Sequence, residues 1–207
     1  RIAVDGVISR TTLLELVEAF YAIAPPTRLK IIDSILAGTL EALTSGRADL
    51  AIGIAVDASN VSGLQQLELG DITFRYVVAP HHRLADELQP ISDDVLRQHR
   101  IIAVADSSRS GHGQTMGVLN GQDVLTVDTM QVKLQAQLRG IGGGYLPDNM
   151  TLPYLRSGQL VERELMRPPR KIKLRYAWCN TTPGKALQWW LDQLQSATTR
   201  ESLLNNH

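Results

Sequence analysis

The chain has 207 residues, of which 21 are basic, 21 are acidic and 43% are hydrophobic. This length is sufficient for one large or two small domains, each with a buried core. The formal charge of zero argues against a nucleic-acid-binding surface on this chain, because contacts to phosphates require a local excess of Lys and Arg.

The same composition disfavours membrane and disulfide-stabilised classes. The longest apolar runs, residues 50–56 and 101–105, are too short to cross a bilayer, so we expect no membrane partner. Cys179 is the single cysteine, which excludes an internal disulfide and favours a reducing, cytoplasmic location. The sequence starts at Arg1 on an apolar strand pattern without a leader, and we therefore expect it to be part of a longer protein.

The first quarter of the chain alternates strands and helices. A helix is predicted over 11–24, because Leu13, Leu16, Val17 and Phe20 recur at helical spacing before a Pro-Pro pair. Strands are predicted at 2–4, 29–32 and 50–56, and a second helix at 36–43 ends near Gly46. Apolar strands separated by helices predict a parallel sheet that is covered on both faces.

The remaining chain repeats this alternation. Strands are predicted at 74–79, 101–105, 124–127, 160–162 and 171–178, with one more strand after the glycine-rich turn 140–144. Helices are predicted at 95–98, 114–119 and 131–138, and a final helix at 186–194. The simplest topology leaves the first lobe near residue 78 and returns near residue 167, so that two strands form a hinge.

Four polar loops follow the predicted parallel strands, at 5–12, 33–36, 106–113 and 128–130. Ligands bind outside the carboxyl ends of such strands. Hydroxyl groups and helix N-terminal N–H groups at this edge suit a small anion or a polar heterocycle. The alternative is that these Ser, Thr and Asp residues only cap helices, where they are favoured in any case.

Two arginines in these loops are candidate ligand contacts. Arg10 begins the first predicted helix, and Arg109 lies in the loop after the 101–105 strand. A guanidinium binds a carboxylate or a ring carbonyl through paired hydrogen bonds. The alternative for Arg109 is an internal ion pair with Asp106.

No pattern typical of an enzyme is present, so we expect no catalytic activity, no cofactor and no metal. The Ser110-Gly-His-Gly113 run lacks the strand–nucleophile–helix context of a nucleophile elbow. The glycines at 140–144 precede a predicted strand, whereas the glycines of a dinucleotide fingerprint follow one. His81 and His82 are adjacent in a predicted turn, where neighbouring side chains point apart.

Three segments, at 40–53, 77–85 and 138–147, resemble motifs of the effector-binding domain of LysR-type transcriptional regulators. Leu40-Glu-Ala-Leu-Thr-Ser-Gly-Arg-Ala-Asp-Leu-Ala-Ile-Gly53 is similar to that family's "L..L..G..DlaI" segment. Val77-Val-Ala-Pro-His-His-Arg-Leu-Ala85 is similar to "vvapdHPLA", and Leu138-Arg-Gly-Ile-Gly-Gly-Gly-Tyr-Leu-Pro147 to "v.aGlGig.lP". Arg83 departs from the family pattern, which has Pro there. The resemblance covers essentially the whole chain in order.

The resemblance implies an α/β fold of two Rossmann-like lobes with a hinge, like that of type II periplasmic binding proteins. Lobe I would comprise residues 1–78 and 167–207, and lobe II residues 79–166. An N-terminal winged helix-turn-helix domain, absent from this chain, would contact DNA. The ligand contacts implied by position are Ser9, Arg10, Ser34, Leu36, Ser108, Arg109, Thr129 and Met130.

The resulting hypothesis is a cytoplasmic sensor domain that binds a small polar metabolite in the cleft between the lobes and thereby controls transcription. The run Asp106-Ser-Ser-Arg109 is similar to one found in a subgroup of these regulators, some members of which are associated with purine-type or ureide metabolism. Together with the arginines, which suit a carboxylate, this makes a carboxylate, a nucleobase or a ureide the expected effector. A homodimer or tetramer is expected, with Leu14 and Tyr21 as candidate interface residues. The alternative function is that of a periplasmic solute-binding protein of a transporter.

Overall fold

The computed structural model describes residues 1–23, 27–56, 58–109, 115–179 and 182–205. The chain divides into two compact units. The first unit contains Arg1–Asp71, Asp106–Gly113 and Lys173–His207, and the second contains Ile72–Ala105 and Gln114–Ile172. Strands β4 (Gln65–Val78) and β9 (Arg170–Trp178) each run from one unit into the other. The segment that follows residue 105 packs with the first unit, which the sequence pattern did not indicate.

The first unit is built on the predicted parallel sheet. Strand β1 (Ile2–Asp5) pairs in parallel with β2 (Ile31–Ser34) on one side and with β3 (Leu50–Ile54) on the other. The sheet then continues from β3 to the antiparallel strand β9. All residues of β1 and β3 are buried, as near-continuous apolar strands predict when helices cover both faces of a sheet.

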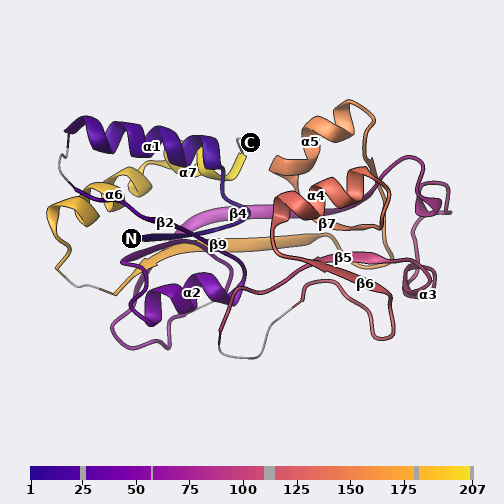
Figure 1. Cartoon of the computed structure of the whole chain (residues 1–207), viewed down its shortest axis with the longest axis horizontal. Helices are drawn as coiled ribbons and strands as arrows, with labels where there is room; N and C mark the ends of the chain where they lie inside the picture. The colour runs from indigo at the N-terminus through magenta and orange to yellow at the C-terminus, as the bar shows by residue number, and fades with distance from the viewer. Residues whose placement is uncertain (24–26, 57, 110–114, 180–181, 206–207) are drawn as a thin grey trace. The chain divides into compact units, whose positions relative to one another are not determined.

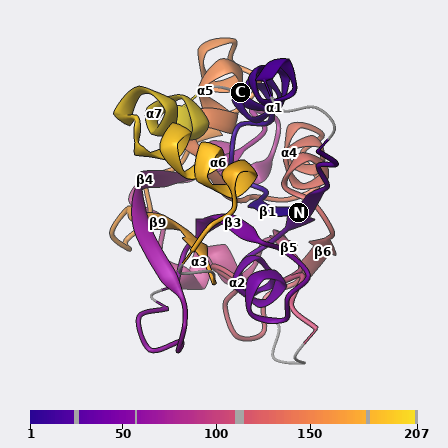
Figure 2. The same cartoon turned by 90° about the vertical axis from the view of Figure 1, so that its left-hand side faces the viewer.

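Helices cover both faces of this sheet. Helices α1 (Arg10–Ile23), α6 (Lys185–Gln195) and α7 (Ala197–Asn205) lie on one face, and α2 (Ala37–Thr44) lies on the other (Figures 1 and 2). The ring centroid of Phe20 on α1 lies 5.2 Å from that of Trp189 and 5.9 Å from that of Trp190 on α6. This aromatic cluster fixes α1 against the C-terminal helices.

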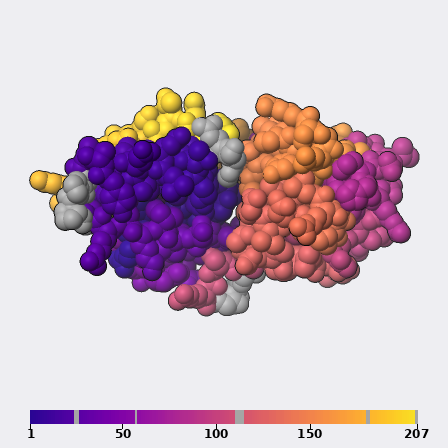
Figure 3. Space-filling model, turned by 45° about the horizontal axis from the view of Figure 1, so that its top comes forward, coloured from indigo at the N-terminus to yellow at the C-terminus, as the bar shows by residue number. Residues whose placement is uncertain are grey.

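Helix α1 carries apolar side chains that the core does not cover. Leu14 is 63% exposed, Tyr21 46% and Ile23 64%. In the space-filling view, the N-terminal residues form a broad face of the first unit beside the C-terminal residues (Figure 3). The candidate interface residues Leu14 and Tyr21 are therefore exposed in this chain.

The second unit has its own strands and helices. Strand β5 (Ile101–Val104) pairs in parallel with β6 (Val124–Val127), and one parallel bridge joins Ile101 to Gly143. Strands β7 (Gly144–Pro147) and β8 (Val161–Glu162) pair antiparallel with β4. The helices are α3 (Asp93–Arg97), α4 (Met130–Leu138) and α5 (Asp148–Arg156), with a 3-10 turn at Arg83–Ala85.

Several predicted elements differ from the structure. The described residues 115–119 form no helix. Helix α5 was not predicted, because Pro153 interrupts its helical pattern. The 186–194 helix is not the last one, since α7 follows it. Strand β4 begins nine residues earlier than expected, and β2 begins at Ile31 rather than residue 29. No described helix is both long enough and apolar enough to span a membrane.

Candidate functional site

Asp5 organises the carboxyl edge of the first unit's sheet. It is the last residue of β1 and is 7% exposed. Its Oδ1 accepts a hydrogen bond from Val7 N at 3.1 Å, and its Oδ2 accepts from Leu36 N at 3.0 Å and from Thr39 Oγ1 at 3.2 Å. Burial raises the pKa of Asp5 to about 6, although these hydrogen bonds favour the charged form. One carboxylate thus joins the loop after β1 to the start of α2.

The start of α2 has no cap from its own N-cap side chain. Leu36 occupies the N-cap position with a φ of 54°, in the left-handed region that non-glycine residues rarely adopt. Asp106 supplies an acceptor instead: its Oδ1 lies 3.2 Å from Gly38 N and 2.9 Å from Ser108 N. A carboxylate therefore already lies at the positive end of the α2 dipole.

Ser107 holds the segment after β5 close to α2. Its Oγ accepts from Ile35 N at 2.8 Å, and its backbone N donates to Ile35 O at 3.3 Å. A Cβ atom on Gly38 would lie 2.0 Å from Ser107 Oγ and 2.7 Å from the Ser107 carbonyl carbon. Only glycine at position 38 allows this approach.

Ser108 and Arg109 complete this contact through Glu41 on α2. Ser108 Oγ donates to Glu41 Oε2, and Arg109 N donates to the same oxygen at 2.8 Å. The Arg109 side chain is exposed. No ion pair joins Arg109 to Asp106, although both residues are described. The ion-pair alternative considered for Arg109 is therefore not observed.

Ser9, Arg10 and Ser34 lie at the same edge, around the ends of β1 and β2. Arg10 Nη2 pairs with the Asp33 carboxylate and lies 3.4 Å from Val4 O. Arg10 Nη1 is buried without a hydrogen-bond partner among the described residues. Ser9 is fully buried, and its Oγ accepts from Thr12 N at 3.2 Å, as a helix cap does. Ser34 is 3% exposed.

The other two predicted contacts, Thr129 and Met130, belong to the second unit. Thr129 is the N-cap of α4, and its Oγ1 accepts from Val132 N at 3.1 Å. Met130 is 8% exposed and packs into the core of its unit. The first unit therefore brings together six of the eight predicted residues. Asp5, Gly38 and Glu41 were not predicted as site residues. The position of Asp5 at the end of an apolar strand could have indicated it as a site residue.

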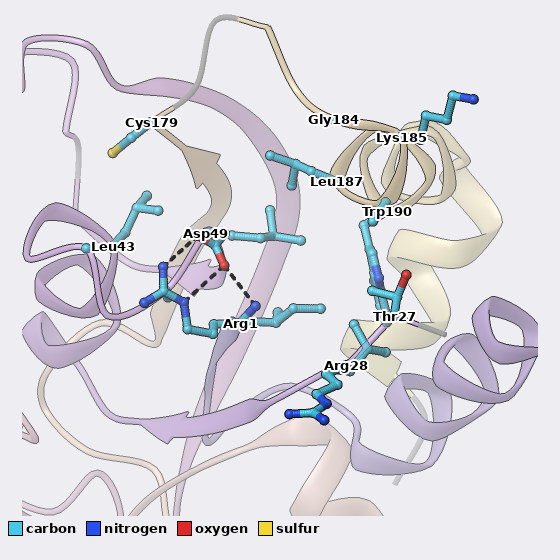
Figure 4. A pocket seen from close by; sticks show the side chains of 16 residues that line it. Arg1, Thr27, Arg28, Leu43, Asp49, Cys179, Gly184, Lys185, Leu187 and Trp190 are labelled. Carbon is cyan, nitrogen blue, oxygen red and sulfur yellow. Dashed lines mark hydrogen bonds and ion pairs between the residues drawn. The ribbon is translucent and has the colours of Figure 1, made fainter. Parts of the chain in front are cut away.

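A separate cavity of about 710 Å³ opens at the amino ends of the strands of the first unit (Figure 4). Arg1 and Asp49 form an ion pair in its wall at 2.8 Å, which lowers the pKa of Asp49 to about 2. Leu43 and Trp190 contribute apolar surface, and Arg28 also lines the cavity. This cavity is at the opposite edge of the sheet from the Asp5 cluster, and no sequence pattern indicated it. The described residues hold no group of three or more His, Cys, Asp or Glu side chains arranged for a metal ion.

The sequence matches a family model described as "LysR substrate binding domain" over residues 1–199. A relative is the HTH-type transcriptional regulator YeeY of Escherichia coli (strain K12), which is 35% identical over 193 residues. That match covers 93% of this chain but 62% of YeeY. The chain thus spans about three fifths of the length of this regulator.

Solved structures show the same fold. Full-length LysG from Corynebacterium glutamicum superposes with a TM-score of 0.71 at 20% identity, over 99% of this chain and 68% of LysG. The regulatory domain of CcmR from Synechocystis PCC6803, in complex with 2-PG, has a TM-score of 0.71 at 18% identity, with 96% of each chain covered. The predicted α/β fold, like that of type II periplasmic binding proteins, is confirmed.

Proposed function

Because the chain belongs to the family of LysR substrate-binding domains, we propose that it binds a small polar metabolite at the carboxyl edge of its parallel strands. In the first unit, the binding groups are the start of α2, Ser34, Leu36 and the segment that carries Ser108 and Arg109. Arg10 and Ser9 shape the adjacent loop, and Thr129 and Met130 are the proposed contacts of the second unit.

The observation that carries this proposal is the cluster around Gly38. Three chain segments, from β1, from the start of α2 and from the 106–109 segment, meet there through hydrogen bonds. Those donated by Leu36 N and Gly38 N are half-buried, and that donated by Ile35 N is exposed. Asp106 already places an anion at the α2 N-terminus. A ligand carboxylate or carbonyl that binds there would compete with the Asp106 carboxylate for Gly38 N and would meet the exposed Arg109 guanidinium.

We further propose that metabolite binding controls transcription through a DNA-binding region outside this sequence, in a cytoplasmic protein. The greater length of YeeY supports this proposal. A ligand changes the output of such a protein only through its different affinities for two conformations.

Self-association through α1 is part of the same proposal. The exposed side chains of Leu14 and Tyr21 lie seven residues apart on one face of α1, and an exposed apolar helix face is typical of an interface. Light scattering is expected to detect a dimer or tetramer at micromolar concentration, and Leu14→Glu is expected to shift it toward the monomer. A strict monomer in the unaltered chain would contradict this part of the proposal.

A thermal-shift screen of carboxylates, nucleobases and ureides tests the metabolite site. Trp178, Trp189 and Trp190 all belong to the first unit, so tryptophan fluorescence follows the unit that holds the proposed site. A bound metabolite is expected to raise the midpoint. Arg109→Ala should abolish this rise and leave the midpoint without metabolite nearly unchanged.

Arg28→Ala is the matched control. Arg28 is an exposed arginine of the same unit, but it lines the cavity at the amino ends of the strands. The proposal predicts that Arg28→Ala retains the metabolite-induced rise. If Arg28→Ala loses the metabolite-induced rise while Arg109→Ala and Arg10→Ala both keep it, the metabolite binds in the cavity at the amino ends of the strands. That result would contradict the proposal.

A further inference from the structure

The second unit contains a cavity of about 450 Å³. Its walls come from β4, from β7 and from the segment 162–169, which begins at the end of β8. Every residue that lines it belongs to the second unit. Sites for small molecules are usually clefts or cavities of about 300 to 1,000 Å³. The size of this cavity therefore suits a small ligand.

Three side chains that line this cavity lie in one row across neighbouring strands. Tyr76 on β4 is paired with Tyr145 on β7. On the other side of β4, Arg163 N donates to Tyr76 O at 2.8 Å and continues the pairing of β8 with β4. Residues that lie opposite each other in paired strands project from the same face of the sheet. The rings of Tyr76 and Tyr145 meet edge to face with their centroids 5.3 Å apart, and the Arg170 guanidinium lies 4.9 Å from the Tyr145 centroid. This face of the sheet therefore combines two aromatic rings with two cations.

Arg163 is a buried cation without a counter-ion in the described part of the chain. It is 8% exposed, and none of the ion pairs between described residues involves it. Its Nη2 donates to Glu87 O, but its Nε is buried and has no hydrogen-bond partner. A guanidinium keeps its proton in proteins. Because the charge persists, its burial is costly unless an anion pairs with it.

The carboxylates that line the cavity do not pair with Arg163. Glu162 forms an ion pair with Arg75 at 2.7 Å, and Arg75 also pairs with Asp148 at 2.6 Å. Glu164 is exposed and belongs to no ion pair between described residues. The position of the missing anion is therefore open to a ligand.

We propose that this cavity binds a small aromatic carboxylate, whose charged group pairs with the Arg163 guanidinium. The unpaired Nε of Arg163 donates to a carboxylate oxygen. Phe74, Tyr145 and the proline pair 168–169 supply the apolar wall against which the ligand ring lies. This site is independent of the metabolite site proposed in the first unit.

The test compares sodium benzoate with benzamide, its neutral isostere, at matched ionic strength. The second unit holds none of the three tryptophans, so hydrogen exchange of peptides that cover 72–78 and 161–167 reports on the cavity, and scanning calorimetry gives the midpoint. At saturating benzoate, we expect slower exchange in both peptides and a rise in the midpoint of about 4 °C. Benzamide should produce neither effect. Equal effects of the two probes would overturn the proposal.

Substitutions locate the benzoate effect. Arg163→Met should abolish it, because methionine fills the space without a charge. Arg156→Met is the matched control, since Arg156 is an exposed arginine of the same unit, and it should leave the effect intact. Arg109→Ala should also leave it intact, because Arg109 belongs to the first unit. Retention of the benzoate effect in Arg163→Met, or slower exchange confined to residues 34–41, would contradict the proposal.

A measurement on the unaltered chain does not depend on how the variants fold. The Nε–H resonance of Arg163 should shift with benzoate in heteronuclear NMR spectra and should not shift with benzamide. An unchanged Arg163 resonance at saturating benzoate would overturn the proposal.

Discussion

The start of α2 in the first unit and the start of α4 in the second unit are stabilised by different kinds of partner. Thr129 caps α4 from within its own turn, with Oγ1 3.1 Å from Val132 N. Leu36 provides no such cap to α2. Instead, Asp5 and Asp106, distant in sequence, accept from Leu36 N and Gly38 N.

This difference has a consequence for function. The start of α4 is fixed locally, whereas the start of α2 holds its conformation only while two other chain segments are in place. A ligand that competes for the α2 N–H groups therefore acts on β1 and on the 106–109 segment at the same time. Removal of either kind of partner should show how far each helix start depends on it.

Removal of the Asp5 carboxylate should destabilise the first unit most. Asp5→Ala leaves Val7 N, Leu36 N and Thr39 Oγ1 without their acceptor, which costs about 3 kcal/mol in the free energy of unfolding. Urea denaturation followed by tryptophan fluorescence measures this change. If the free energy of unfolding of Asp5→Ala equals that of the unaltered chain within experimental error, the start of α2 does not depend on Asp5.

The free energy of unfolding should vary with pH because Asp5 binds a proton more tightly in the folded state. Its pKa in the folded state is about 6, above the ordinary value of 3.8. The folded state therefore binds the proton more tightly, and the resulting stabilisation is present at low pH and is lost as the pH rises through about 6. Relative to Asp5→Asn, the unaltered chain should gain about 2 kcal/mol between about pH 7 and pH 4.5. If the difference in the free energy of unfolding between the unaltered chain and Asp5→Asn does not vary with pH, the pKa of Asp5 is not raised in the folded state.

Gly38→Ala tests the close approach of the 106–109 segment to α2. The added Cβ meets Ser107 backbone and side-chain atoms at 2.0 to 2.7 Å, so the segment must move. We expect a loss of about 1.5 kcal/mol and a weaker metabolite-induced midpoint shift in the fluorescence assay. Ala37→Gly, a neighbouring change in the same turn, is the control and should keep the shift. Normal binding by Gly38→Ala would mean that the segment is not part of the site.

Thr129→Ala should weaken only the start of α4. The loss of one helix cap costs about 1 kcal/mol. Because the cap is local, the loss should appear in hydrogen exchange of α4 peptides and not in tryptophan fluorescence, which follows the first unit. A lower fluorescence midpoint would show that the start of α4 is not locally stabilised.

The position of the site was predictable, but its internal connections were not. Loops that follow parallel strands can be identified from periodicity, and Ser108 and Arg109 were found in this way. The contacts of Glu41 with Ser108 and of Gly38 with Asp106 join residues 67 and 68 positions apart, and no local pattern encodes such pairs. Similarly, Pro153 concealed α5, and the buried position of Arg163 gave no signal because arginines are mostly exposed.

Hydrogen exchange with and without the metabolite that gives the largest midpoint shift shows which edge of the sheet holds the metabolite. Binding at the start of α2 should slow exchange at residues 34–41 and at the described residues 106–109, where the α2 N–H groups and the Asp106 segment meet. Slower exchange confined to residues 27–29 and 184–190, which line the cavity at the other edge of the sheet, would contradict it.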